Sequence, residues 1–179
     1  LGDVYKRQIK RYEYEWAGLY LIATFPSRHY DIEMFPAVKA HLLSFGIKRL
    51  EQTGKTHIVN EEKVKARKKT NNKWFETQDS ISYWEDFNKP KIIWKRVGSI
   101  LRFSYNDDGA LGLDSTCFAT GENIEFICCV LNSAMGRFLL KDAPKTGTGD
   151  LLISVQAVEP IKVPIITKEQ NSIFEDSLK

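Results

Sequence analysis

KVKARKKTNNKWFETQDSISYWEDFNKPKIIWKRV, the stretch from Lys63 to Val97, decides how the chain is organised. Its first eleven residues carry six positive charges and no negative charge, and Trp74 and Phe75 follow directly. A turn at Asn88-Lys89-Pro90 then leads into the apolar run Ile92-Ile93-Trp94, which has basic residues on both sides. This pattern predicts a basic loop that leads into a buried strand.

The basic loop suggests a binding function. Recognition sites concentrate on polar loops held by a rigid core, and basic side chains beside aromatic ones suit a polyanion with stackable bases. The chain has a net charge of +3, so without the six cations of the loop it would carry −3. The positive field is therefore local, as expected for a binding patch. The alternative interpretation is a solvated run of charge with no ligand.

Composition predicts an ordinary globular domain. The chain has 179 residues, of which 42% are hydrophobic and 27% charged, enough for one domain with its own core. Its three cysteines form no C-x-x-C pair and its three histidines are scattered, so the sequence predicts neither a disulfide framework nor a zinc site. No run approaches the roughly 20 apolar residues of a membrane helix. We expect a soluble, cytoplasmic protein with no membrane partner.

The periodicity of the chain predicts an α+β fold, with a mixed, mostly antiparallel, curved sheet and two principal helices. The expected sheet includes residues 91–97 and 101–105, the second ending in the strong turn signal Asn106–Gly109. Further strands are expected at residues 19–24 and 116–120, and the helices near residues 32–50 and 122–140.

Both predicted helices have an apolar stripe that we expect to lie in the core. In the first helix Asp31 is a possible cap, Pro36 fits its first turn and Gly46 weakens it late in its course. Its stripe consists of Phe35, Val38, Leu42, Phe45 and Leu50. The stripe of the second helix consists of Ile124, Ile127, Cys128, Leu131, Met135, Phe138 and Leu139. Trp16, Trp84 and Trp94 are also expected in the core, whereas Trp74 is a candidate surface contact.

Two short motifs resemble catalytic or nucleotide sites only superficially. The loop Pro144–Gly149 lacks the G-x-x-x-x-G-K-[ST] spacing of a nucleotide-binding P-loop, although it suits contact with a phosphate backbone. Glu61-Glu62-Lys63 has the E-x-K form of metal-dependent nucleases, but no Pro-Asp partner precedes it on a strand. An enzyme in its own right therefore stays an open alternative with little support.

The two ends of the chain carry separate expectations. Residues 1–8, LGDVYKRQ, do not resemble a signal peptide and look like translated sequencing-adapter sequence joined to a coding frame near Ile9. We expect them to be a non-native leader, and the remainder to be the C-terminal part of a longer protein. Residues 9–165 then form the domain, and residues 166–179 the start of a C-terminal helical extension.

Eight short motifs, in order from Ile9 to Pro164, carry a resemblance to a known family: IKRYxxxWAxLYLIxT, FPAVKAHL, KWFE, FNKPKIIW, FSYNDDG, TCFATG, CCVLNS and VEPIKVP. Together they resemble the TaqI-like C-terminal specificity domain, the target-recognition domain of adenine-specific DNA methyltransferases and of type II restriction-modification enzymes. The segments Leu131-Asn132-Ser133 and Pro160–Pro164 are also similar to the recognition domains of type I specificity subunits. Lys168-Glu169-Gln170 resembles the start of the helix that follows them.

The resemblance implies a domain that reads a short duplex while a separate domain flips an adenine and methylates it with S-adenosylmethionine. This chain has no Asn-Pro-Pro-Tyr or Asp-Pro-Pro-Tyr tetrad and no glycine-rich cofactor loop after a strand. We therefore expect no cofactor in this chain, and double-stranded DNA and the parent's methyltransferase domain as partners. The short Ser27–Tyr30 connection and the basic loop depart from typical members, so the target sequence cannot be transferred.

The candidate DNA-binding residues combine cations that grip phosphates with polar side chains that read base edges. They are Lys65, Arg67, Lys68, Lys69, Asn71, Asn72, Lys73, Trp74, Gln78, Arg96, Arg102, Lys145, Thr146 and Thr148. The competing hypothesis is a protein–protein interaction module in which the basic run is a solvated face.

Overall fold

The structure, a computed structural model, describes residues 9–113 and 115–178, and in them helices occur together with antiparallel sheets. The predicted α+β fold is therefore confirmed. The contacts separate the chain into two units, Tyr20–Trp84 and a second unit made of Leu1–Leu19 and Glu85–Lys179. The expected leader, residues 1–8, lies outside the described residues. In the described part, no helix is both long enough and apolar enough to cross a membrane.

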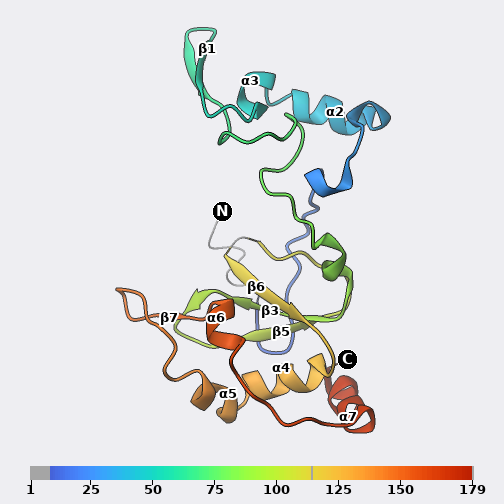
Figure 1. Ribbon diagram of the computed structural model, residues 1–179, viewed down its shortest axis with the longest axis vertical. Helices are drawn as coiled ribbons and strands as arrows, with labels where there is room; N and C mark the ends of the chain where they lie inside the picture. Colours follow the sequence, from blue (N-terminus) through green and yellow to red (C-terminus); the bar gives the residue numbers. More distant parts are fainter. Residues whose placement is uncertain (1–8, 114, 179) are drawn as a thin grey trace. The chain divides into compact units, whose positions relative to one another are not determined.

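A three-stranded antiparallel sheet forms the centre of the unit that contains Glu85–Lys179 (Figure 1). Its strands are β3 (Lys91–Lys95), β5 (Phe103–Asn106) and β6 (Thr116–Thr120), in the order β5-β3-β6. In the register Ile92 lies opposite Tyr105 and Ala119. The apolar run of β3 is buried, as predicted, because it occupies the middle position of the sheet.

A second, two-stranded sheet pairs β4 (Val97–Gly98) with β7 (Leu151–Leu152). The prediction that residues 91–97 belong to one strand is thus only partly right, since the strand changes sheet after Lys95. The backbone between the two sheets is held by the Arg96 N–H, which donates to the Ser115 carbonyl, and by the Arg96 carbonyl, which accepts from Ile153 at 2.8 Å.

Helices cover one face of the central sheet (Figure 1). They are α4 (Ile124–Asn132), α5 (Ala134–Leu139) and α7 (Lys168–Leu178), and a short α6 (Val155–Val158) follows β7. Ile92 and Phe103 of the sheet share the core with Ile124, Cys128 and Leu131 of α4. The helix expected after residue 166 is present as α7, and it packs on α4 within the same unit instead of extending outside it.

The second predicted helix is broken at Ser133. This residue has an extended backbone, and its Oγ accepts hydrogen bonds from the amides of Met135 and Gly136, which caps α5. The break leaves Met135 and Phe138 largely exposed, so the predicted burial of the whole stripe is wrong at its C-terminal end. Before the break, Asn132 joins α4 to the sheet, because its side chain donates to the Phe103 carbonyl at 2.7 Å and accepts from the Phe103 amide at 3.1 Å.

Gly136 should tolerate no side chain. A Cβ built there would overlap the carbonyl group of Leu131, which the break at Ser133 brings against the first turn of α5. We expect Gly136→Ala to lower the free energy of unfolding of this unit by about 2 kcal/mol, because backbone must move to make room. Gly147→Ala is the matched control, since a Cβ there meets nothing within 4 Å. Hydrogen exchange of the α4 and β5 amides measures the stability of both variants. Equal protection from exchange in the two variants would contradict the packing at Gly136.

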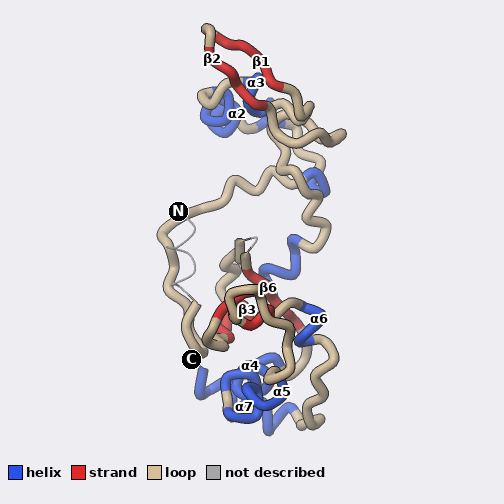
Figure 2. The backbone as a smooth tube through the Cα atoms, turned by 90° about the vertical axis from the view of Figure 1, so that its left-hand side faces the viewer, coloured by secondary structure: helices blue, strands red, loops and turns tan. Residues whose placement is uncertain are grey.

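The unit Tyr20–Trp84 begins with two short 3₁₀ helices, η1 (Pro26–Arg28) and η2 (Ile32–Met34). Next come α2 (Pro36–Leu43), α3 (Ile47–Leu50), and a hairpin of β1 (Thr56–Val59) and β2 (Glu62–Lys65); η3 (Trp84–Asn88) follows at the boundary of the unit. Figure 2 shows β1 and β2 side by side, next to α3.

The single helix predicted over residues 32–50 is therefore wrong. Pro36 starts α2, and Gly46, with φ at +86°, separates α2 from α3. None of the α2 residues is buried, and Phe35 and Phe45 of the predicted core stripe are 44% and 51% exposed.

The predicted strand at residues 19–24 is also wrong. No strand is assigned there, and Leu19 to Ile22 are exposed, with Tyr20 at 89%. Trp94 is buried as expected and Trp84 is half-buried, whereas Trp16 is 54% exposed. Apolar runs of this length do not distinguish a strand from an extended segment, because the pairing partner is not encoded in the run itself.

Candidate nucleic-acid interface

The basic run of the sequence lies on a two-stranded hairpin and on the segment that follows it. In the antiparallel register Thr56 pairs with Lys65 and Ile58 with Lys63. The pairing continues below β1 and β2, where the Ala66 amide donates to the Lys55 carbonyl at 2.9 Å. At the tip, Asn60 and Glu61 both have positive φ, +50° and +69°, as a type I′ turn requires. The loop predicted for this region from the sequence is therefore wrong, since the region contains a hairpin.

The hairpin has two different faces, because alternate residues of a strand point to opposite sides. His57 and Val64, which lie opposite each other, are half-buried, and His57 Nε2 lies 3.4 Å from Glu51 Oε2. This is the inward face. The outward face carries Thr56, Ile58, Lys63 and Lys65, all exposed.

Arg67 fixes the base of the hairpin. Its Nε donates to the backbone carbonyl of Leu50 at 2.9 Å. Its Nη1 donates to the backbone carbonyl of Glu76 at 2.8 Å, and its Nη2 to that of Trp74 at 2.6 Å. Burial lowers the pKa of the guanidinium, which remains a cation at neutral pH. All three guanidinium nitrogens of Arg67 thus donate to backbone carbonyls. We therefore assign Arg67, which the sequence suggested as a phosphate contact, a structural role.

Gln52 and Asn72 complete this base. The buried Gln52 amide donates to the carbonyls of Lys73 at 3.0 Å and Glu76 at 2.9 Å. Asn72 Nδ2 donates to the carbonyls of Thr77 at 3.0 Å and Gln78 at 2.9 Å. The amide donors of Asn72 therefore hold the loop and are not presented to a base, so the prediction that Asn72 reads a base edge is wrong. The buried role of Gln52 was not predicted from the sequence, because a single glutamine has no sequence pattern that indicates burial.

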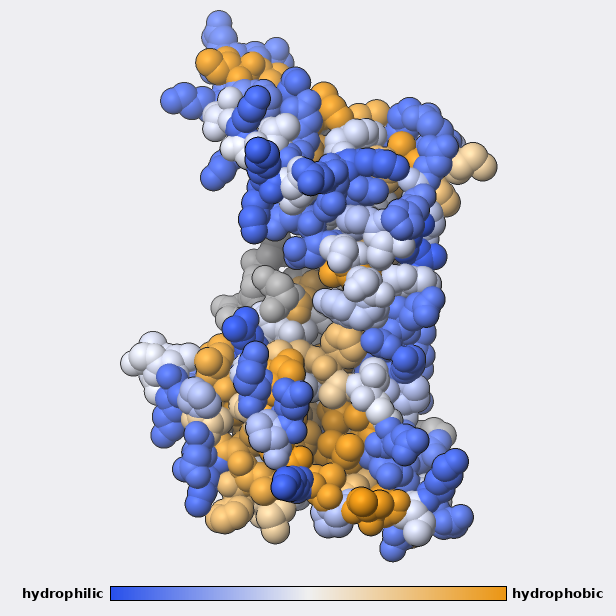
Figure 3. All heavy atoms as spheres, viewed as in Figure 1, coloured by the Kyte–Doolittle hydropathy of each residue, from blue (hydrophilic) through white to orange (hydrophobic). Residues whose placement is uncertain are grey.

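The lysines of the hairpin and the following segment remain exposed. We refer to them together as the hairpin lysines: Lys55, Lys63, Lys65, Lys68 and Lys69. Among the described residues none of them has an ion-pair partner. The unit Tyr20–Trp84 has eleven basic against seven acidic residues, a net charge of +4, so the positive charge of the chain resides in it. Figure 3 shows hydrophilic side chains over most of the visible hairpin surface, with apolar atoms among them.

The other candidates of this unit differ in exposure. Asn71 and Gln78 are exposed, and Lys73 is exposed with its Nζ 5.5 Å from the centre of the Phe75 ring. Trp74 is half-buried and packs edge-on against Phe75 at 5.6 Å between ring centres. Of the polar candidates in this unit, Asn71 and Gln78 therefore have exposed amide groups.

The remaining candidates belong to the other unit. Arg96 and Lys145 are exposed at the small β4-β7 sheet, where the backbone of Lys145 forms an isolated antiparallel β-bridge with Leu151. The hydroxyls of Thr146 and Thr148 lie 2.9 Å apart, and Arg102 is half-buried. These residues thus belong to a different unit from the hairpin lysines.

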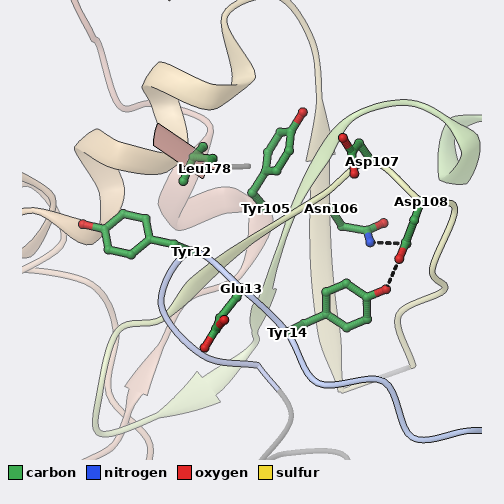
Figure 4. A pocket seen from close by; sticks show the side chains of 8 residues that line it. All are labelled: Tyr12, Glu13, Tyr14, Tyr105, Asn106, Asp107, Asp108 and Leu178. Carbon is green, nitrogen blue, oxygen red and sulfur yellow. Dashed lines mark hydrogen bonds between the residues drawn. The ribbon is translucent and has the colours of Figure 1, made fainter. Parts of the chain in front are cut away.

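This second unit also contains a cavity of about 320 Å³ beside the outer edge of β5 (Figure 4). The chain around Tyr12 adds to that edge, since the Tyr12 amide donates to the Phe103 carbonyl and its carbonyl accepts from Tyr105. The lining residues are Tyr12, Glu13, Tyr14, Tyr105, Asn106, Asp107, Asp108 and Leu178. Three carboxylates make it unsuitable for a phosphate.

Three of the residues that line the cavity, Tyr14, Asn106 and Asp108, are joined by hydrogen bonds. The Tyr14 hydroxyl and the Asn106 amide both donate to Asp108 (Figure 4). The buried Lys91 donates to Asn106 Oδ1 and to the Phe87 carbonyl. Burial, followed by the hydrogen bond to Asp108, raises the pKa of Tyr14 to about 12. This chain of hydrogen bonds locks the turn after β5 and explains the Asn106–Gly109 signal in the sequence.

The E-x-K motif does not belong to a cluster of metal ligands. Glu61 lies in the hairpin turn and Lys63 on the outward face of β2. In the described ranges 9–113 and 115–178, no group of three or more histidine, cysteine or acidic side chains is arranged to hold a metal ion.

Comparison of the chain with protein-family models and with curated proteins found no match.

Proposed function

We propose that this chain recognises double-stranded DNA and that the unit Tyr20–Trp84 grips it through the hairpin lysines. The observation that carries this proposal is a set of exposed lysines without ion-pair partners, among the described residues, on a hairpin whose base is fixed by Arg67 and Gln52. A cation that is held in place but not neutralised by its own protein is available to a polyanion.

Counterion release gives such a surface its affinity. Each lysine that neutralises a phosphate frees condensed cations from the duplex, and binding then weakens linearly in log affinity against log salt. The same lysines carry no sequence information, so selectivity is assigned to Asn71, Gln78 and the outward face of the hairpin.

The family resemblance supports a more specific role, target recognition for an adenine-specific DNA methyltransferase in the cytoplasm. In that role a separate catalytic domain binds S-adenosylmethionine and the flipped adenine. We assign the cofactor to that domain because this sequence has no Asn-Pro-Pro-Tyr or Asp-Pro-Pro-Tyr tetrad and no glycine-rich cofactor loop. The present chain then contributes the choice of site and no chemistry.

A protein-interaction module is the second candidate. It is supported by apolar side chains exposed near α2, of which Met34 is 73% and Phe45 51% exposed. Single apolar residues are common on protein surfaces, and those near α2 do not account for the lysines of the hairpin. Binding to a protein through α2 would leave the affinity for DNA independent of the hairpin.

A salt titration of the 179-residue chain on duplex DNA tests the proposal. We expect binding at low salt and a negative slope of log affinity against log salt, of about 0.9 for each neutralised phosphate. Four neutralised phosphates would give a slope of about −3.6 on this scale. An affinity that is undetectable at low salt, or that does not respond to salt, would refute the proposal.

The purified chain should also transfer no methyl group from labelled S-adenosylmethionine to DNA. This follows from the role assigned above, in which the adenine and the cofactor bind to another domain. Detectable transfer would show that the chain carries a catalytic site of its own.

A further inference from the structure

Ile58 is unusual among the residues of the outward hairpin face. Its side chain is 76% exposed, although it lies within strand β1 and shares the outward face with the polar residues Thr56, Lys63 and Lys65. Lys63 lies directly opposite it on β2, and the next pair along the same face is Thr56 and Lys65. A single exposed isoleucine is ordinary, but this one shares its face with Lys63 and Lys65, which have no ion-pair partner among the described residues.

The two strands contribute different chemistry to this face. β2 supplies the ammonium groups of Lys63 and Lys65, whereas β1 supplies the hydroxyl of Thr56 and the methyl groups of Ile58. When such a face meets DNA, lysines reach phosphates, and the shorter apolar and hydroxyl groups are left to meet base edges. The face therefore combines a phosphate-binding edge with a reading edge.

A two-stranded ribbon has the right dimensions for this task. Its strands lie about 4.8 Å apart, and the major groove, about 12 Å wide, admits a ribbon of that kind. In the major groove the apolar group offered by a base is the C5 methyl of thymine. Cytosine without modification and both purines offer an isoleucine no such partner.

We propose that the β1–β2 ribbon enters the major groove with its outward face toward the bases and that Ile58 contacts a thymine methyl group. This inference rests on the proposed function, since it requires that the chain bind duplex DNA. It adds that the bound sequence contains a thymine read by contact with its methyl group, and it assigns that contact to one side chain.

The test removes the methyl group from the DNA and the isoleucine from the protein. Duplexes are first enriched from a random pool on the 179-residue chain, and each thymine of the enriched sequence is then replaced singly by deoxyuridine. We expect one replacement to weaken binding about fourfold, the effect of burying one methyl group, and the others to have little effect.

Ile58→Ala should weaken binding to the thymine duplex by at least as much and should remove the sensitivity to that deoxyuridine. Val59→Ala is the matched control, because Val59 is the next residue along β1 and points to the opposite face. It should keep the full sensitivity. Far-ultraviolet circular dichroism should be unchanged in both variants, since neither side chain is buried.

The outcomes separate the two proposals. If no duplex is bound, the proposed function fails and this inference fails with it. If duplexes are bound with a salt-dependent slope, but no sequence is enriched or no thymine position responds to deoxyuridine, only the inference is refuted. It is also refuted if Ile58→Ala retains the sensitivity of the parent chain.

Discussion

Replacing Lys63, Lys65, Lys68 and Lys69 with glutamine is expected to weaken duplex binding by about two to three orders of magnitude at about 0.1 M salt. All four side chains are exposed, and among the described residues none is ion-paired, so each is free to neutralise a phosphate. The slope of log affinity against log salt should become less steep by about 0.9 for each phosphate that is no longer neutralised. Arg67 is left intact in this variant, because its removal would disturb the base of the hairpin.

A variant with the same change in net charge separates local effects from the overall field of the protein. In this variant glutamine replaces four exposed lysines outside the unit Tyr20–Trp84: Lys10, Lys141, Lys162 and Lys168. We expect it to keep most of the affinity and nearly the whole slope. If the hairpin variant matches the parent chain, the basic run is a solvated face, and the DNA surface must be sought around Arg96, Arg102 and Lys145.

Base readout should behave differently from charge. Gln78→Ala removes an exposed amide that can donate to or accept from a base edge, and it leaves every lysine in place. If Gln78 reads a base, the variant should lose about 1–3 kcal/mol on the enriched duplex and little on a scrambled one, with the salt slope unchanged. An equal reduction on both duplexes would assign Gln78 to the phosphate backbone.

The central sheet was predictable because its signals are local. The apolar run of β3, the turn at Asn106–Gly109 and the short strand at residues 116–120 each indicate their structure within a few residues. The helix breaks were harder to predict. Gly46 and Ser133 end helices that the apolar spacing alone would continue, and spacing does not report backbone conformation.

The candidate site was predictable in composition but not in the roles of its members. Six cations in eleven residues correctly locate a basic surface, yet the sequence does not show which side chains are turned inward. Lys68 is exposed, whereas the adjacent Arg67 is engaged by the carbonyls of Leu50, Trp74 and Glu76. Backbone carbonyls are the same at every position, so a residue that binds them leaves no complementary signal elsewhere in the sequence.

Arg67→Ala is expected to destabilise the unit Tyr20–Trp84 by about 3 kcal/mol. The substitution deprives three carbonyls of a charged donor, and hydrogen bonds to charged groups are worth about 1.5–3 kcal/mol each before allowance for the partial exposure of this site. These three hydrogen bonds join Arg67, at the base of the hairpin, to the end of α3 and to the turn that contains Trp74 and Glu76. Hydrogen exchange at the amides of Gly54, Ala66 and Glu76 measures the destabilisation directly.

Two further variants distinguish a structural arginine from a phosphate-binding one. Arg67→Lys keeps the charge but cannot reproduce three donors in a planar fork, so it should restore little of the stability. Lys68→Ala removes the neighbouring charge and should change stability by less than about 0.5 kcal/mol, because its side chain is exposed. If Arg67→Ala instead kept full protection from exchange and reduced only the salt-dependent affinity, while Arg67→Lys restored that affinity, Arg67 would bind phosphate as the sequence suggested. The geometry leads us to expect the opposite, since a guanidinium that holds three carbonyls contributes to binding by keeping the hairpin in place for the lysines around it.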